Sequence, residues 1–207
     1  MTTLARALQQ NNWTITAALS VALLGLLALS PAEATLGNAV KLVYAHGAAE
    51  RVAEYAYLIA GGLGLWSLRG MTDSHARWTR AVTETAIVFW LAQFMISLPA
   101  QIVAWGGLTW NEPRVIGAIW IGVLTPLVYA VARWIGDPSW MALAAVANAA
   151  IVLIVLRGAI NILHPLDPIV GSDSTAIKFF YAAIVLVTGA LAAQFARYRA
   201  RVSTRGE

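Results

Sequence analysis

The chain has 207 residues, of which 59% are hydrophobic and 12% are charged, and its formal net charge is +4 at pH 7. Soluble domains contain about 25% charged residues, so this composition excludes a soluble globular domain and predicts one membrane-embedded domain over residues 1–207. The basic residues form no aromatic-interleaved patch, which argues against a nucleic-acid partner, and the lack of cysteine excludes thiolate chemistry and thiolate ligation of haem.

The chain carries six apolar segments of about the length that crosses a bilayer. We expect membrane-spanning helices at residues 13–29, 52–68, 81–104, 115–134, 140–163 and 176–196. The connections are short, and small residues in the second segment, at Gly61, Gly62 and Gly64, favour close helix packing. The sequence therefore predicts an all-α polytopic membrane protein, a six-transmembrane-helix bundle.

The first segment has a second interpretation. Arg6, the apolar run and the small residues that follow Ser30 also fit a secretory signal peptide with its cleavage site. We expect retention as a true span, because the apolar run is long for a signal peptide.

Most basic residues fall at one side of the expected bundle, which the positive-inside rule makes cytoplasmic. They are Arg6, Arg69, Arg77, Arg80, Arg133, Arg197, Arg199, Arg201 and Arg205. Both termini are then cytoplasmic, and the loops near 30–51, 105–114 and 164–175 face outward. We place the chain in the cytoplasmic (inner) membrane, with its site on the outer, periplasmic side.

Two histidines lie at the outward-facing side. His46 comes just before the second expected span, and His164 comes just after the fifth. Neutral imidazole is a good ligand for haem iron, and two imidazoles fill both axial positions. The pair predicts a bis-histidine site for haem b with His46 and His164 as metal ligands; the alternative is two helix-end histidines, each solvated or bonded to a backbone carbonyl.

Three further features supply candidate cofactor contacts. In the loop 105–114, Trp105 and Trp110 offer broad aromatic faces, and Gly106 allows close backbone approach. Arg114 suits a haem propionate, and Glu112 is placed to hold it. Arg157, expected inside the fifth span, is a second candidate for a propionate or a partner for Glu54; a structural ion pair is an equal alternative.

These residues resemble a known family, the CcmC-type haem-handling protein of cytochrome c maturation. Tyr44-Ala-His46-Gly-Ala-Ala49 is similar to its motif Tyr-x-His-x-Pro-Ala-Ala-Trp. The loop 105–114 aligns without gaps on its signature Trp-Gly-x-Trp-Trp-x-Trp-Asp-x-Arg, and Asn161-Ile-Leu-His164 resembles Asn-Thr-Leu-His. The resemblance covers the chain from about Lys41 to the last span.

The resemblance implies a function that is not enzymatic. In that family the two histidines hold haem at the outer face, and the tryptophan loop covers the macrocycle for delivery to a haem chaperone beside an ABC-type haem exporter. Here Leu108, Thr109 and Asn111 replace the central tryptophans. Two alternatives stay open: a fixed b-haem, or a haem-free structural subunit, in a larger respiratory or photosynthetic complex.

Overall fold

The computed structural model describes residues 3–160, 169 and 171–202, with residues 3–12 as backbone only. It is all-α, as the sequence predicts, and the described residues form six helices. These are α1 (Thr3–Leu29), α2 (Val40–Arg69), α3 (Asp73–Trp105), α4 (Pro113–Ile135), α5 (Pro138–Gly158) and α6 (Thr175–Val202).

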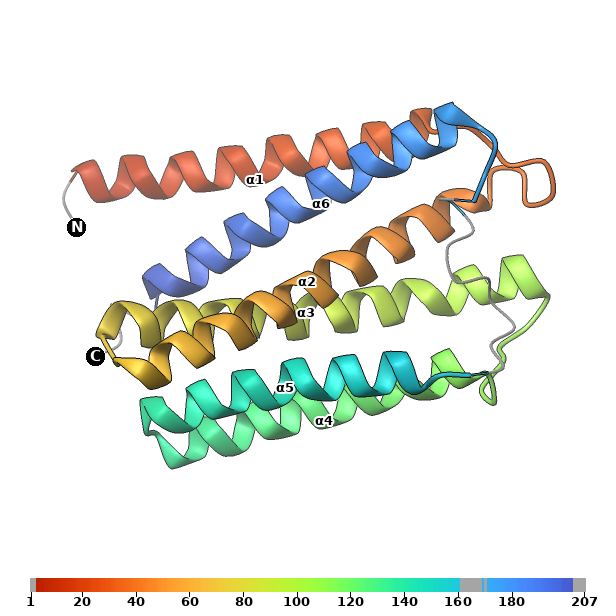
Figure 1. Cartoon of the computed structure of the whole chain (residues 1–207). Coiled ribbons are helices and arrows are strands. Elements are labelled where there is room, and N and C mark those ends of the chain that lie inside the picture. Colours follow the sequence, from red (N-terminus) through yellow and green to blue (C-terminus); the bar gives the residue numbers. More distant parts are fainter. Residues whose placement is uncertain (1–2, 161–168, 170, 203–207) are drawn as a thin grey trace.

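The six helices run up and down along a common direction (Figure 1). Helices α2 and α3 occupy the middle, with α6 and then α1 on one side and α5 and α4 on the other. We call one end of the bundle the His46 end; it holds the ends of α1, α3 and α5 and the starts of α2, α4 and α6. The opposite end, which holds the start of α1 and the end of α6, is the Arg133 end.

Among the described residues, four helices are long and apolar enough to cross a membrane: α3, α4, α5 and α6. Helix α1 contributes a shorter apolar stretch, Trp13–Leu29. Helix α2 begins at Val40, whereas the sequence predicts its span only from residue 52. The additional three turns at the start of the helix carry charged residues, which is why they fall outside the apolar run. The structure is thus compatible with a membrane protein, and α2 is not one of the four helices that are apolar enough to cross a membrane.

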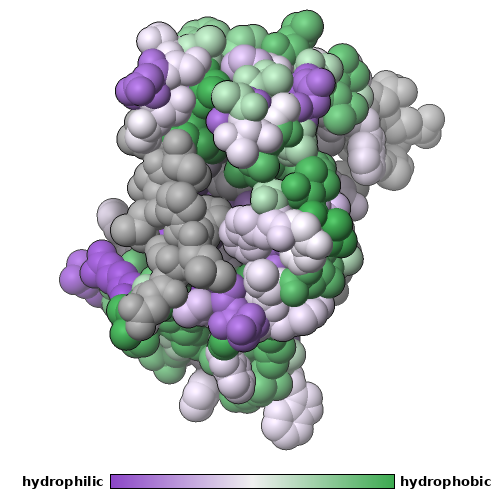
Figure 2. Space-filling model, turned by 90° about the vertical axis from the view of Figure 1, so that its right-hand side faces the viewer, coloured by the Kyte–Doolittle hydropathy of each residue, from purple (hydrophilic) through white to green (hydrophobic). Residues whose placement is uncertain are grey.

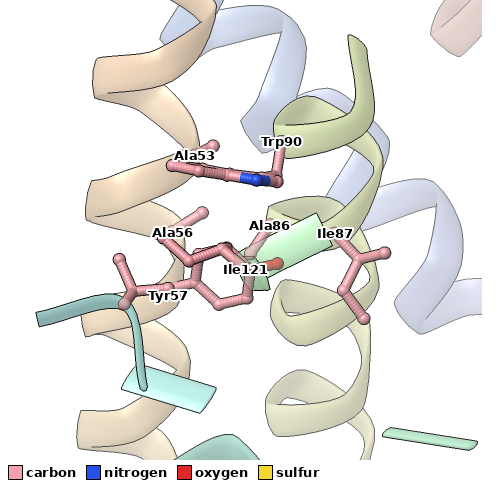
Figure 3. Close-up of a cluster of buried hydrophobic side chains, with 8 residues drawn as sticks. Ala53, Ala56, Tyr57, Ala86, Ile87, Trp90 and Ile121 are labelled. Atoms are coloured by element: carbon pink, nitrogen blue, oxygen red, sulfur yellow. The ribbon is translucent and has the colours of Figure 1, made fainter. Parts of the chain in front are cut away.

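The main hydrophobic core lies between α2, α3, α4 and α5 (Figure 3). The rings of Tyr57 on α2 and Trp90 on α3 meet edge to face, with centroids 6.3 Å apart. Each ring also satisfies its polar atom: Trp90 Nε1 donates to the Ala118 carbonyl at 3.0 Å, and the Tyr57 hydroxyl lies 2.6 Å from Thr125 Oγ1. These two bonds tie the central helix pair to α4.

Glycines on α2 allow α5 to approach closely, as the sequence predicts for two of three positions. A Cβ built on Gly61 would lie 2.6 Å from the Ala149 Cβ, and one on Gly64 would lie 2.6 Å from the Ala142 carbonyl oxygen. Gly62 faces open space. Gly61 and Gly64 are therefore the positions where only hydrogen fits between α2 and α5.

A charged cluster joins three helices nearer the Arg133 end. Glu84 of α3 accepts from Arg80 Nε at 3.0 Å, from Arg199 of α6 and from the Tyr129 hydroxyl of α4. The pairing with Arg80 agrees with the sequence, in which the two residues stand four apart on one helix. The Arg199 and Tyr129 contacts, which link distant segments, have no counterpart in the sequence pattern.

Candidate functional site

A cavity of about 460 Å³ opens at the His46 end, between α2, α3 and the start of α4. Its volume falls in the range of about 300–1,000 Å³ that small-molecule and cofactor sites occupy. The polar and aromatic residues that bear on its chemistry are His46, Glu50, Gln93, Trp105, Glu112 and Arg114. Figure 2 looks onto this end, where hydrophilic residues form a few separate patches among pale and apolar ones.

His46 lies inside α2, because the helix begins six residues before it at Val40. Its Nδ1 atom is 3.3 Å from the backbone carbonyl oxygen of Gln93 on α3. A carbonyl only accepts, so Nδ1 carries the hydrogen in this contact, and in the neutral ring Nε2 is the nitrogen with a lone pair for a metal. Metal-binding histidines are commonly oriented in this way, with one ring nitrogen donating to a carbonyl and the other facing the metal.

A carboxylate stands beside the other ring nitrogen of His46, Nε2. Glu50, one helical turn after His46, places Oε2 3.8 Å from His46 Nε2. Both side chains are about one-fifth exposed, so water reaches the pair. The carboxylate would hold a protonated His46 as an ion pair, and it would have to give way to a bound metal.

The loop 105–114 is held in place by α3 and by its own cap. Gly106 adopts the left-handed conformation, with φ of 76°, and its N–H donates to the Ile102 carbonyl, which ends α3. Gln101 Oε1 accepts from both the backbone N–H and the hydroxyl of Thr109, at 3.2 and 3.1 Å. The loop therefore has a defined path across the cavity rim.

Glu112 ends this loop as the N-cap of α4. Its Oε2 accepts from the Val115 N–H at 2.9 Å, and Pro113 occupies the first helical position. The expected role, holding Arg114, is replaced by this capping bond. Arg114 itself lines the cavity, as does Trp105.

Two buried polar atoms at the cavity have no hydrogen-bond partner among the described residues. They are Gln93 Nε2, a donor, and Glu112 Oε1, an acceptor, each on a side chain that is 1% exposed. Buried polar groups are normally satisfied, so a polar ligand or water at this site would find a donor and an acceptor in place. Sequence reasoning missed Gln93; an amide inside an apolar helix was the available signal.

The other sequence-predicted residues lie outside the cavity lining. Trp110 is 53% exposed, and Gly106 makes the turn of the loop without facing the cavity. Arg157 is exposed in the last turn of α5, which ends at Gly158 and not at residue 163. Glu54, its suggested partner, lies 3.5 Å from Arg51 Nη1.

The second expected ligand, His164, falls outside the described residues. Ile169 and Ser172, which follow it, line the cavity, so the chain returns to this site after residue 164. No group of three or more His, Cys, Asp or Glu side chains placed to hold a metal ion occurs in the described part of the chain.

One carboxylate near the cavity has a shifted acidity. Glu33, in the connection between α1 and α2, accepts from the N–H groups of Leu36 and Thr35, both at 2.8 Å. These bonds favour the charged carboxylate and lower the pKa of Glu33 below its ordinary 4.5. The bonds close the turn that leads into α2 and thereby shape the cavity wall.

The arrangement combines an imidazole, an indole, a guanidinium and largely apolar walls. Such a set suits a flat apolar cofactor that carries a metal ligand site and carboxylate groups. No family model matches this sequence, and no significant match is found among curated proteins.

Proposed function

We propose that this chain is a haem-binding integral membrane protein of the CcmC-like type, which holds haem b at the outer face of the inner membrane. The observation that supports this is that three residues matching the family's motifs meet at one cavity. His46 comes from one motif of the family, Trp105 and Arg114 come from the two ends of another, and all three line one cavity.

Each of these residues has a defined task in the proposed site. His46 would bind the haem iron through Nε2, while the Gln93 carbonyl would hold the ring in the required tautomer. Trp105 provides an aromatic wall and Arg114 a counterion for a propionate. The resemblance assigns the second axial position to His164. The bound haem would contribute a redox-active iron, held at the membrane surface.

The charge distribution supports the proposed orientation. The arginines at the helix termini, including Arg69, Arg77 and Arg133, gather at the Arg133 end, which the positive-inside rule makes cytoplasmic. Both termini are then cytoplasmic and the His46 end is periplasmic. The exposed Trp110 and Gly106 on the rim are available to a partner such as a haem chaperone or an ABC-type haem exporter.

A second candidate is a fixed b-haem, or a haem-free subunit, in a larger respiratory or photosynthetic complex. The loop favours it, because Thr109 stands where the family has a tryptophan and is bonded to Gln101. Compared with the family's loop, a loop held by these hydrogen bonds offers less surface for docking and is more rigid.

The test is haemin titration of the purified protein, followed by oxidised and reduced absorption spectra. We expect six-coordinate bis-histidine spectra for the wild type, weakened binding in His46→Ala, and loss of haem in the double variant with His164→Ala. The matched control is His75→Ala, which removes the histidine at the other end of the bundle and leaves the spectra unchanged. Unaltered haem content in the double variant would refute the proposal.

Transfer experiments separate the alternatives. Rapid passage of haem to an apo-chaperone favours the assembly function, and retention with a reversible midpoint potential favours a fixed redox centre. A wild-type protein that stays colourless with added haemin identifies the haem-free subunit.

A further inference from the structure

A second cavity, of about 330 Å³, lies at the Arg133 end, far from the proposed haem site. It is formed by the first turns of α3, the end of α4 and the start of α5. Its charged lining residues are Asp73, Arg77, Arg80, Arg133 and Asp137.

Two of these arginines are not neutralised by neighbours. Arg80 is bonded to Glu84, and Asp137 caps α5 by accepting from the Ser139 N–H at 2.7 Å. For Arg77 and Arg133, no carboxylate of the described residues lies within ion-pair distance. The cavity thus presents the guanidinium groups of Arg77 and Arg133, neither of them ion-paired to a described residue, beside the carboxylates of Asp73 and Asp137.

The surroundings of this cavity are those of a membrane interface. Exposed tryptophans stand beside its lining residues: Trp78 follows Arg77, Trp134 follows Arg133, and Trp140 precedes Met141. Tryptophan is enriched at the level of lipid headgroups, where its ring is in apolar surroundings and its N–H meets water.

An apolar ridge leads along α4 to the same place. Its members recur every three or four residues, as one face of a helix requires, and all are at least 40% exposed. They are Ile116, Trp120, Val123, Leu127, Val131 and Trp134. The ridge runs most of the length of α4 and ends next to Arg133, so an acyl chain lying on it would bring its headgroup to the cavity.

We propose that the cavity binds the phosphate of an anionic phospholipid headgroup through Arg77 and Arg133, with the acyl chains along the α4 ridge. Guanidinium groups match phosphate oxygens in geometry and charge, and basic pockets between helices suit acidic headgroups. The apolar ridge and the tryptophans favour a lipid over a soluble phosphate, which would use the arginines alone. This site does not depend on haem.

The test compares the lipids that the wild type and its arginine variants retain in nanodiscs. The nanodiscs are made from phosphatidylcholine with a minor share of phosphatidylglycerol. The wild type should enrich phosphatidylglycerol, measured by mass spectrometry of the lipids released after detergent extraction. The double variant Arg77→Gln/Arg133→Gln should weaken that preference by at least roughly tenfold, since each arginine near an anionic surface contributes about a fivefold factor.

The matched control is Arg69→Gln/Arg197→Gln, which removes the same charge from exposed arginines at the same end but outside the cavity. Retained preference in this control supports the site, and an equal loss in both variants shows a diffuse charge effect and overturns it. Circular dichroism confirms that both variants fold. Inorganic phosphate is the probe for a soluble ligand: if it displaces phosphatidylglycerol at millimolar concentration, the cavity is a simple anion site and the lipid proposal is wrong.

Discussion

The imidazole of His46 is joined to the backbone of Gln93, with 3.3 Å between Nδ1 and the carbonyl oxygen, and this contact links α2 to α3 beside the cavity. Because a backbone carbonyl cannot be substituted away, the bond fixes the tautomer of His46 independently of the side chain at residue 93. The state of this ring is therefore the first measurable consequence of the structure.

We predict that His46 is the Nδ1–H tautomer, with Nε2 unprotonated. The measurement is ¹⁵N NMR of histidine-labelled protein in detergent at pH 8. His75, whose Nδ1 lies 2.9 Å from the Gly70 carbonyl, serves as an internal reference with the same tautomer. On addition of haemin the His46 and His164 signals should be displaced and the His75 signal should not; an Nε2–H tautomer at His46 would contradict the proposed ligation geometry.

Replacing Thr125 by Val should destabilise the bundle by about 1–3 kcal/mol, because the buried Tyr57 hydroxyl loses its partner. The Thr125 hydroxyl donates to the Ile121 carbonyl at 2.8 Å, so the Tyr57 hydroxyl is the donor in their bond. Tyr57→Phe and the double variant complete a double-mutant cycle, in which the free energy of unfolding is measured by thermal or denaturant unfolding in detergent. Strictly additive effects would show that the bond contributes nothing.

Gly64→Ala should destabilise the α2–α5 contact by about 1–3 kcal/mol, because the new methyl group meets a backbone oxygen that cannot rotate away. Gly62→Ala is the control two residues away on the same helix. It faces open space and gains up to about 1 kcal/mol from helix propensity. Unfolding midpoints that shift in the same direction for both variants would disprove the close packing.

Gln101→Ala should release the loop 105–114, since it removes both bonds to Thr109. Hydrogen exchange at the Thr109 amide should accelerate by about tenfold, which corresponds to about 1.4 kcal/mol for the lost bonds. The Val115 amide, held by Glu112, should keep its protection. Unchanged exchange at Thr109 would mean that other contacts hold the loop.

Acid should open the turn between α1 and α2. The pKa of Glu33 is lowered in the folded protein, so its stabilising bonds are fully present above the ordinary value of 4.5 and are lost as pH falls through the folded-state value. Glu33→Gln should speed exchange of the Thr35 and Leu36 amides at neutral pH. An NMR titration that places the pKa of the Glu33 carboxyl at or above 4.5 would argue against these bonds in the turn.

The helices could be predicted from the sequence because each contains a long apolar run, although among the described residues only α3, α4, α5 and α6 are apolar over a membrane-spanning length. The boundary errors have a common cause. Residues 40–51 of α2 are helical but carry charge, and so they fall outside an apolar run. The predicted end of α5, at residue 163, lies beyond its observed end at Gly158, because apolar residues continue to Leu163.

The candidate site was predictable in its members but not in its contacts. Motif spacing singled out His46, Trp105 and Arg114, which line one cavity. The Gln93 carbonyl was not predictable, because every residue has a carbonyl and only the register of α2 against α3 selects this one. The capping role of Glu112 was open to detection, since an acidic residue before Pro113 is a common helix start.

The charged cluster around Glu84 has a consequence for how the chain enters a membrane during synthesis. Arg199 and Tyr129 belong to helices that follow α3 in the chain, so they cannot accompany Glu84 when α3 first leaves the ribosome. Arg80 can, because it lies four residues earlier on the same helix. On insertion helix α3 would thus carry its own counterion, and the later helices would add Arg199 and Tyr129 to a pair that persists in the folded protein.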